Sequence, residues 1–104
     1  MTEARKVVED MRYQGKDESI PYSITTTPWG SSPASISVTA WDVSAGAYTD
    51  VTATVIPGSA SAVGDVITLP KLLSLTQGHK YRIEVKFTCS GKIFECYFYV
   101  WAEL

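Results

Sequence analysis

The sequence predicts an all-β protein, an antiparallel β-sandwich of about seven strands. Three observations favour this fold class. The carboxyl-terminal strands have matching apolar sides, turn residues recur at intervals of roughly 8–12 residues, and the composition is rich in Ser, Thr, Val and Tyr. At 104 residues the chain is long enough for one domain with a buried core. We expect no helix of ordinary length after residue 18.

The clearest element is a hairpin over residues 80–102 with a two-residue turn at Ser90-Gly91. Apolar and polar residues alternate along both of its strands. A turn at this position puts Phe87 opposite Phe94, so that the apolar side chains of both strands share one face. A shift of one residue would destroy this match. The inward set is Tyr81, Ile83, Val85, Phe87, Cys89, Phe94, Cys96, Phe98 and Val100.

Shorter strands precede the hairpin, and loops rich in Pro, Gly and Ser separate them. Apolar alternation and turn residues predict strands at 20–27, 35–43, 51–56, 60–63 and 66–69. We expect a loop at residues 27–33, which contains Trp29, and a connection at residues 70–78 that crosses to the hairpin. Cys89 and Cys96 lie on one face of the predicted hairpin, about four residues apart along the strands. That offset is roughly 13 Å, whereas a disulfide needs Cα atoms within about 7 Å, so we expect two reduced, buried thiols.

Residues 1–18 differ from the rest because charged residues make up about half of them. We therefore divide the chain into a charged amino-terminal arm at 1–18 and a sandwich at 19–104. Two interpretations of the arm remain open, a solvated, flexible tail and an arm that docks on a partner. No apolar stretch has the length of a signal peptide core or a membrane span, so we expect synthesis in the cytoplasm without a signal peptide.

The sequence contains none of the motifs that identify common enzyme classes. There is no Gly-x-Ser-x-Gly elbow, phosphate-binding glycine loop or His-Glu-x-x-His helix. His79 is expected to be a solvated loop histidine, and the three aspartates Asp42, Asp50 and Asp65 lack the spacing of a calcium loop. The net charge is −2 and the basic residues are scattered, which does not favour nucleic-acid binding. We expect a non-enzymatic protein without catalytic, cofactor or metal sites.

Aromatic residues on the outer side of the hairpin form the best candidate for a binding site. If the apolar set faces the core, then Ile93, Tyr97, Tyr99 and Trp101 point outward. Such a row is a larger apolar surface than most monomers expose, and aromatic residues dominate protein contacts. Two other interpretations remain open: the row is covered within the domain, for instance by residues 7–13, or its rings pack only as cross-strand neighbours. Trp29 is a candidate loop contact, and Trp41 is either a contact or the buried tryptophan of a sandwich.

The segment at 75–81 resembles the tyrosine corner of immunoglobulin-like and fibronectin type III domains. Leu75, Gly78 and Tyr81 follow in that order, and Tyr81 begins a strong strand. In that motif the tyrosine hydroxyl bonds to the backbone a few residues upstream and fixes the crossing between the two sheets. The resemblance implies an immunoglobulin-like sandwich with Tyr81 in this structural role.

Residues 14–103 resemble a family of small bacteriophage and prophage structural proteins with an immunoglobulin-like fold. The most specific part is the ending Gly-x-x-Tyr-x-Ile, Thr-x-x-Gly-Lys-x-x-Glu, which spans residues 78–95. Other matching pieces are Lys16-Asp17-Glu18, Tyr22 and Ile24, Trp29, residues 36–42, Asp50-Val51-Thr52 and residues 64–67. The resemblance implies a virion component of the tail, adaptor or fibre-attachment region. Its partners would be other virion proteins or copies of itself, with no nucleic-acid or membrane partner.

Two alternatives to a virion component remain open. One is a carbohydrate- or surface-binding module, because exposed Trp and Tyr rings stack on sugars. Glycan sites also need polar side chains beside the rings, and the chain has no Asn and only Gln14 and Gln77. The other alternative is a bacterial interaction module outside a virion.

Overall fold

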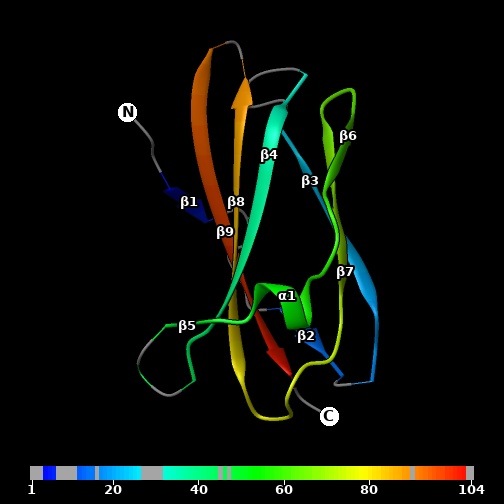
Figure 1. Ribbon diagram of the computed structural model, residues 1–104, viewed down its shortest axis with the longest axis vertical. Coiled ribbons are helices and arrows are strands. Elements are labelled where there is room, and N and C mark those ends of the chain that lie inside the picture. Colours follow the sequence, from blue (N-terminus) through cyan, green and yellow to red (C-terminus); the bar gives the residue numbers. More distant parts are fainter. Residues whose placement is uncertain are drawn as a thin grey trace.

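The computed structural model describes residues 4–6, 12–15, 17–26, 32–44, 46, 48–89 and 91–102. Within these ranges the chain is mostly β-structure in two sheets, which confirms the all-β prediction and is consistent with a sandwich. Figure 1 shows the sheets as neighbouring layers. One contains β4 (Ala34–Asp42), β8 (Lys80–Cys89) and β9 (Lys92–Ala102), and the other contains β3 (Ile20–Thr25), β6 (Ser61–Val63) and β7 (Val66–Leu72).

The larger sheet has the strand order β1–β9–β8–β4–β5, where β1 is Ala4–Lys6 and β5 is Thr49–Asp50. A further strand, β2 (Arg12–Gln14), also pairs with β9. The smaller sheet has the order β3–β7–β6. The described ranges contain nine strands, more than expected, because β1, β2 and β5 are additional and one predicted strand is a helix.

The carboxyl-terminal hairpin has the register that the sequence predicts. Phe87 pairs with Phe94, and Cys89 pairs with Lys92, which leaves two residues for the turn. Gly91 in this turn has a φ of +78°, a conformation that residues with a Cβ rarely adopt. Every residue of the predicted inward set is buried except Phe94, which is half-buried against the core. Matching apolar faces and a two-residue turn therefore suffice to fix this pairing.

The core lies between the sheets and receives side chains from both. Ile24, Ile67, Leu69 and Leu72 come from the smaller sheet, and the inward set of the hairpin comes from the larger one. Both cysteines are free and buried, as expected. Burial raises the pKa of the Cys96 thiol to about 12, because the thiolate would lose its hydration. This thiol therefore behaves as a small apolar residue.

The amino-terminal segment differs from the expected separate arm. β1 and β2 both add to β9 in parallel, with Ala4 opposite Glu95 and Arg12 opposite Val100. The backbone edge of β9 offers unpaired N–H and C=O groups, and these two short segments pair with them. The boundary at residue 18 therefore does not separate this part of the chain from the sandwich. Residues 1–3, 7–11 and 16 of the expected arm lie outside the described residues.

Gln14 at the end of β2 is the strongest link between this segment and the rest of the fold. Its side chain is fully buried, and its Nε2 donates hydrogen bonds to the backbone oxygens of Leu72, at 2.7 Å, and Glu18, at 3.0 Å. Its Oε1 accepts a hydrogen bond from the Tyr22 hydroxyl at 2.8 Å. The side chain thereby connects the larger sheet to β3 and β7 of the smaller one.

The strand predicted at 51–56 is wrong. The chain forms β5 and then a single helical turn, α1 (Thr52–Val55), which buries Val55 and Ile56 (Figure 1). The Asp50 carboxylate accepts hydrogen bonds from the backbone N–H and the hydroxyl of Thr52, at 3.0 and 2.7 Å. These bonds also hold the pKa of Asp50 below its usual value. A local side-chain bond has thus overridden the strand preference of the β-branched residues.

Candidate protein-contact face

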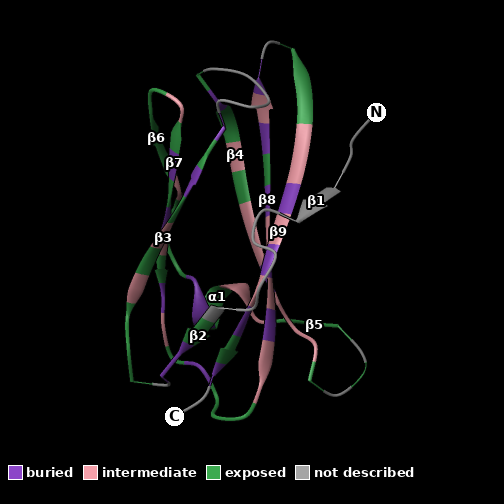
Figure 2. Ribbon diagram, turned by 180° about the vertical axis from the view of Figure 1, so that it is seen from behind, coloured by how far each residue is buried: buried purple, intermediate pink, exposed green. Residues whose placement is uncertain are grey.

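The aromatic row predicted on β9 faces away from the core. Tyr97, Tyr99 and Trp101 alternate with the buried residues Cys96, Phe98 and Val100 (Figure 2). Trp101 is 38% exposed, whereas Tyr97 and Tyr99 are half-buried. The orientation of this row follows from the pleat of β9, in which successive side chains point to opposite faces.

The structure brings most of the predicted row together but leaves Ile93 apart. The rings of Tyr97 and Tyr99 pack edge to face with centroids 5.8 Å apart. Trp101 pairs across the strands with Lys80 on one side and with Tyr13 of β2 on the other. Ile93 is 47% exposed but lies at the turn end of the hairpin, opposite Thr88. The candidate loop contact Trp29 lies outside the described residues.

Three further aromatic residues extend this surface. Tyr13 is 61% exposed beside Trp101, and Trp41 of β4 packs against the ring of Tyr48 at 6.1 Å. Trp41 is half-buried and does not belong to the buried core set, so it is not the buried tryptophan of a sandwich. We call the six residues together the outer aromatic face: Tyr13, Trp41, Tyr48, Tyr97, Tyr99 and Trp101.

Arg82 lies at the centre of the outer aromatic face. Its guanidinium carbon is 3.9 Å from the ring centroid of Tyr97, and its Nη1 donates a hydrogen bond to the Tyr99 hydroxyl at 3.3 Å. Its Nε donates to the Glu84 carboxylate at 2.7 Å. Burial alone would lower the pKa of Arg82, but the bonds to Tyr99 and Glu84 outweigh this effect and raise it. The guanidinium therefore holds both tyrosine rings in fixed positions.

Two more polar contacts complete this arrangement. The Lys80 ammonium lies 4.5 Å from the ring centroid of Tyr99, and the indole nitrogen of Trp41 donates a hydrogen bond to Glu84 at 2.8 Å. Cations therefore lie against the two tyrosines of β9, which leaves Trp101 and Tyr13 as the most open rings of β9 and β2. A shallow depression of about 140 Å³ lies beside Tyr97, and its lining includes Arg82 and residues of β4 and β9. The surface suits a flat contact rather than a deep ligand pocket.

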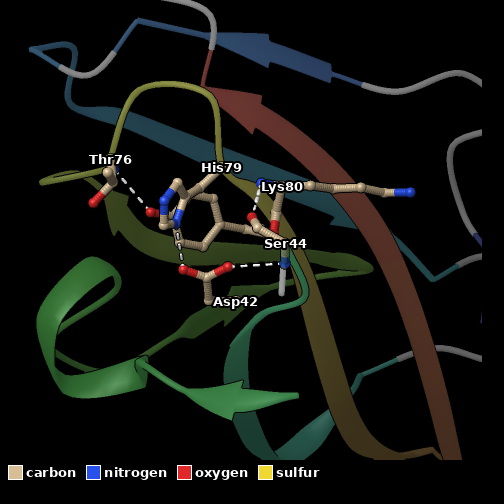
Figure 3. Close-up of polar contacts among 6 residues, drawn as sticks. Asp42, Ser44, Thr76, His79 and Lys80 are labelled. Atoms are coloured by element: carbon tan, nitrogen blue, oxygen red, sulfur yellow. Dashed lines mark hydrogen bonds and ion pairs between the residues drawn. The ribbon is translucent and has the colours of Figure 1, made fainter. Parts of the chain in front are cut away.

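Tyr81 makes the backbone contact expected of a tyrosine corner. The residue is buried, and its hydroxyl accepts a hydrogen bond from the backbone N–H of Thr76, five positions upstream, at 2.8 Å (Figure 3). The bond ties the start of β8 to the connection that arrives from the smaller sheet. Tyr81 thus has a structural contact and does not belong to the outer aromatic face.

We expect Tyr81→Phe to lower the free energy of unfolding by about 1 kcal/mol, because the Thr76 N–H loses its acceptor. Urea denaturation followed by tryptophan fluorescence measures this difference. Tyr48→Phe is the matched control. Tyr48 is 55% exposed, so the loss of its hydroxyl should leave the free energy of unfolding unaltered. Equal stability of Tyr81→Phe and the wild type would contradict a stabilising role for the bond between Tyr81 and Thr76.

His79 lies in the connection before β8, as expected, and its side chain is 41% exposed, but it also pairs with Asp42. Its Nδ1 lies 2.7 Å from a carboxylate oxygen of Asp42, and the other oxygen of Asp42 accepts the Ser44 N–H at 3.0 Å (Figure 3). Partial burial would raise the pKa of Asp42, but the bonds from His79 and Ser44 outweigh it and hold this pKa below its usual value. The pair connects the end of β4 to the start of β8.

The group of Asp42, His79 and Ser44 includes the residue types of a hydrolase triad but not its contacts. Ser44 Oγ accepts a hydrogen bond from the Lys80 N–H at 2.7 Å, and Figure 3 shows that Ser44 and the imidazole contact different oxygens of the Asp42 carboxylate. A nucleophilic serine needs the imidazole as its hydrogen-bonded base. Within the described ranges, no three His, Cys, Asp or Glu side chains are close enough together to hold a metal ion.

The cations of the outer aromatic face were not identified from the sequence, although a signal was present. The predicted hairpin register already puts Arg82 opposite Tyr99 and Lys80 opposite Trp101, as the structure does. Tyr13 gave no comparable signal, because the pairing of β2 with β9 joins parts of the chain that are far apart in sequence.

The chain has no match among known proteins in any of three comparisons: no protein-family model, curated protein or solved structure resembles it significantly. In the described part of the chain, no helix has the length and apolar character needed to cross a membrane.

Proposed function

We propose that the protein is a non-enzymatic structural component of a phage or prophage virion, in the tail, adaptor or fibre-attachment region, and that it acts by protein–protein assembly. The observation that carries the proposal is the outer aromatic face, in which Trp101 and Tyr13 lie exposed side by side on paired strands. The virion context rests on the resemblance of residues 14–103 to small phage structural proteins. The protein would be made in the bacterial cytoplasm and become part of the particle.

The strand order supports the immunoglobulin-like type of sandwich. In that fold one sheet contains neighbouring strands B, E and D, and the other contains G, F and C. The orders β3–β7–β6 and β9–β8–β4 correspond to these sets in the same sequence along the chain. Tyr81 then occupies the start of strand F, which is the position of the tyrosine corner.

The outer aromatic face is suited to assembly because its central rings are already ordered. Binding normally costs the conformational entropy of the side chains that it immobilises. Arg82 and Lys80 hold Tyr97 and Tyr99 in place before any partner arrives. Tryptophan and tyrosine are also the residues that most often contribute large binding energies at the centre of protein interfaces. The expected partners are other virion proteins or copies of this chain.

The carbohydrate-binding alternative has less support. A sugar ring stacks on the open face of an aromatic side chain, and cations already lie against the faces of Tyr97 and Tyr99. The residues that line the neighbouring depression include four charged side chains but no amide side chain. A Trp101-dependent signal on a glycan array would nevertheless favour this alternative over assembly.

The proposal predicts that Tyr13→Ala with Trp101→Ala prevents incorporation into the particle. Loss of the two most exposed aromatic contacts, worth together at least about 2 kcal/mol, should lower binding roughly 30-fold or more. Particles that lack the protein are prepared from the bacterium that encodes it, and each purified variant is added to them. The amount of variant that sediments with the particles measures incorporation. Circular dichroism must show that the variant is folded.

Val63→Ala is the matched control for this experiment, because Val63 is 83% exposed on β6 of the smaller sheet. It should be incorporated like the wild type. Wild-type incorporation of the double variant would refute assembly through the outer aromatic face. Absence of the wild-type chain from purified particles would refute the virion context itself.

A further inference from the structure

Among the residues that the structure describes, the larger sheet has an open edge along β4. β4 pairs with β8 along most of its length, but with β5 only at Trp41 and Asp42. The backbone groups of Ala40 on this side are also occupied, because its N–H donates to the Thr52 hydroxyl and its C=O accepts the N–H of Val51. Figure 1 shows α1 and β5 beside the lower part of β4, and the upper part of β4 continues beyond them.

Ile36 and Val38 direct their backbone groups to this open edge. In an antiparallel pair, successive residues direct their N–H and C=O alternately toward and away from the partner strand. Ala40 directs these groups away from β8, so Val38 does the same. The register of β4 on β8 is irregular between Ala34 and Ser37. Ile36 nevertheless packs against the core on the same face as Val38, so its backbone groups follow the direction of those of Val38. Among the described residues, neither has a backbone hydrogen-bond partner on that side. Unpaired edge groups of this kind can pair with another strand.

This edge lacks most features that prevent edge-to-edge pairing. Residues 34–41 contain no charged residue and no proline. The irregularity between Ala34 and Ser37, with Ser35 at a φ of +53°, limits the stretch of regular pairing with β8 to residues from Ser37 onward, and Ile36 lies at its margin. The other edges are better protected, because β1 and β2 cover β9, β6 has three residues, and β3 contains Pro21 and a shift of register.

We propose that β4 pairs with β4 of a second copy of this chain, antiparallel about a two-fold axis at Ser37. In this register Ile36 of one copy lies opposite Val38 of the other, and each pair can exchange two backbone hydrogen bonds. Ile36 and Val38 are half-buried and pack against the core of their own copy, so the pairing brings apolar side chains together. Ser37 meets its own counterpart on the outer side, where the hydroxyls stay solvated.

A second copy fits this edge better than an unrelated strand, because the stretch is complementary to itself. The register pairs Ile with Val and Ser with Ser and opposes no charged residues. A two-fold pairing also uses up the open edge in both copies and closes the assembly as a dimer. The interface does not use the outer aromatic face, so the proposal is independent of the proposed function. About four backbone hydrogen bonds per dimer imply a weak, concentration-dependent association.

Two cysteine variants test the register directly. Two Ser37 residues would form a non-hydrogen-bonded pair with Cα atoms about 4.5 Å apart, which is within the range of a disulfide. We therefore expect Ser37→Cys to give a disulfide-linked dimer under mild oxidation, visible on a non-reducing gel. Thr39→Cys is the matched control, because the two Thr39 residues would be separated by about four residues, or roughly 13 Å. The native cysteines are buried in the wild-type fold, so we expect them to take no part in the cross-link.

Val38→Pro tests the same edge in the chain without added cysteines. Proline removes the N–H of Val38, which faces the open edge, and leaves the bonds between β4 and β8 intact. Sedimentation velocity at concentrations up to the millimolar range should show a dimer for the wild type and only monomer for Val38→Pro. Val38→Ala keeps the N–H and should still dimerise, which separates the backbone effect from the loss of the side chain.

The proposal is overturned if the wild type is monomeric throughout this range, or if Thr39→Cys cross-links as efficiently as Ser37→Cys. If Val38→Pro fails to fold, cross-linking of Ser37→Cys compared with Thr39→Cys, together with sedimentation of the wild type, still tests the proposal. Loss of dimerisation would leave incorporation into particles through the outer aromatic face unaffected. The two experiments therefore test the dimer and the proposed function separately.

Discussion

Replacing Gln14 with alanine is expected to lower the free energy of unfolding by about 3 kcal/mol, because it removes three buried or half-buried hydrogen bonds at once. The backbone oxygen of Leu72 and the hydroxyl of Tyr22 would each lose a partner, and a cavity would form at a fully buried position. Urea denaturation measured by circular dichroism gives the difference, with the slope of the transition as a check that the folded state is retained.

Gln77→Ala is the matched control, since Gln77 is the only other glutamine and is exposed in the turn before β8. Surface substitutions of this kind usually change stability by less than about 0.5 kcal/mol. If Gln14→Ala is as stable as Gln77→Ala, the pairing of β2 with β9 does not depend on this side chain, and the bonds to Leu72 and Tyr22 contribute little.

Phe87→Ala is expected to destabilise the protein by about 4 kcal/mol, because a fully buried phenyl ring leaves a cavity that the core cannot fill. Phe87 is completely buried and packs against its cross-strand partner Phe94 with ring centroids 5.8 Å apart. Phe94 is only half-buried, so Phe94→Ala should cost about half as much. Thermal and urea denaturation of both variants measures the two losses.

The comparison between these two variants tests the register of the hairpin as well as the contribution of each phenyl ring to stability. A slip of one residue along the strands would exchange the inner and outer faces of one strand. If β8 were turned over, Phe87 would face outward and Phe87→Ala would cost little; if β9 were turned over, Phe94 would face outward and Phe94→Ala would cost little. A negligible loss of stability for either variant would therefore contradict the pairing that the sequence predicts and the structure contains.

The sequence predicted the hairpin correctly because local rules determine it completely. Alternation sets the buried face of each strand, and a two-residue turn with glycine at the second position sets the register. The prediction for 51–56 failed because Val51, Val55 and Ile56 favour a strand, while the bonds from Thr52 to the Asp50 carboxylate favour a helical turn. Such a contact involves a single pair of residues and gives no periodic signal.

The amino-terminal strands were missed for a different reason. β1 and β2 have three residues each, too few for alternation to be visible, and their pairing depends on an edge more than eighty residues away in the chain. The charge-rich composition of residues 1–18 favoured a solvated arm. The buried position of Gln14 could not be deduced, because its three partners come together only in the tertiary structure.

The candidate site was predicted in part. The outward direction of Tyr97, Tyr99 and Trp101 followed from the pleat of one strand, which is a local property. The position of Arg82 between two tyrosine rings depends on the rotamers of long side chains, which the strand register does not determine. Sequence reasoning therefore found the rings of the site but not the cations that hold them.

The parallel pairing of β1 and β2 with β9 has a consequence for the order of folding. A chain leaving the ribosome exposes its first residues first, yet these two strands can be added only after Lys92–Ala102 has been synthesised. The larger sheet is therefore completed after translation of that segment, in a late step that joins segments far apart in the sequence. Until this step the side chain of Gln14 stays solvated, because its burial requires the pairing of β2 with β9.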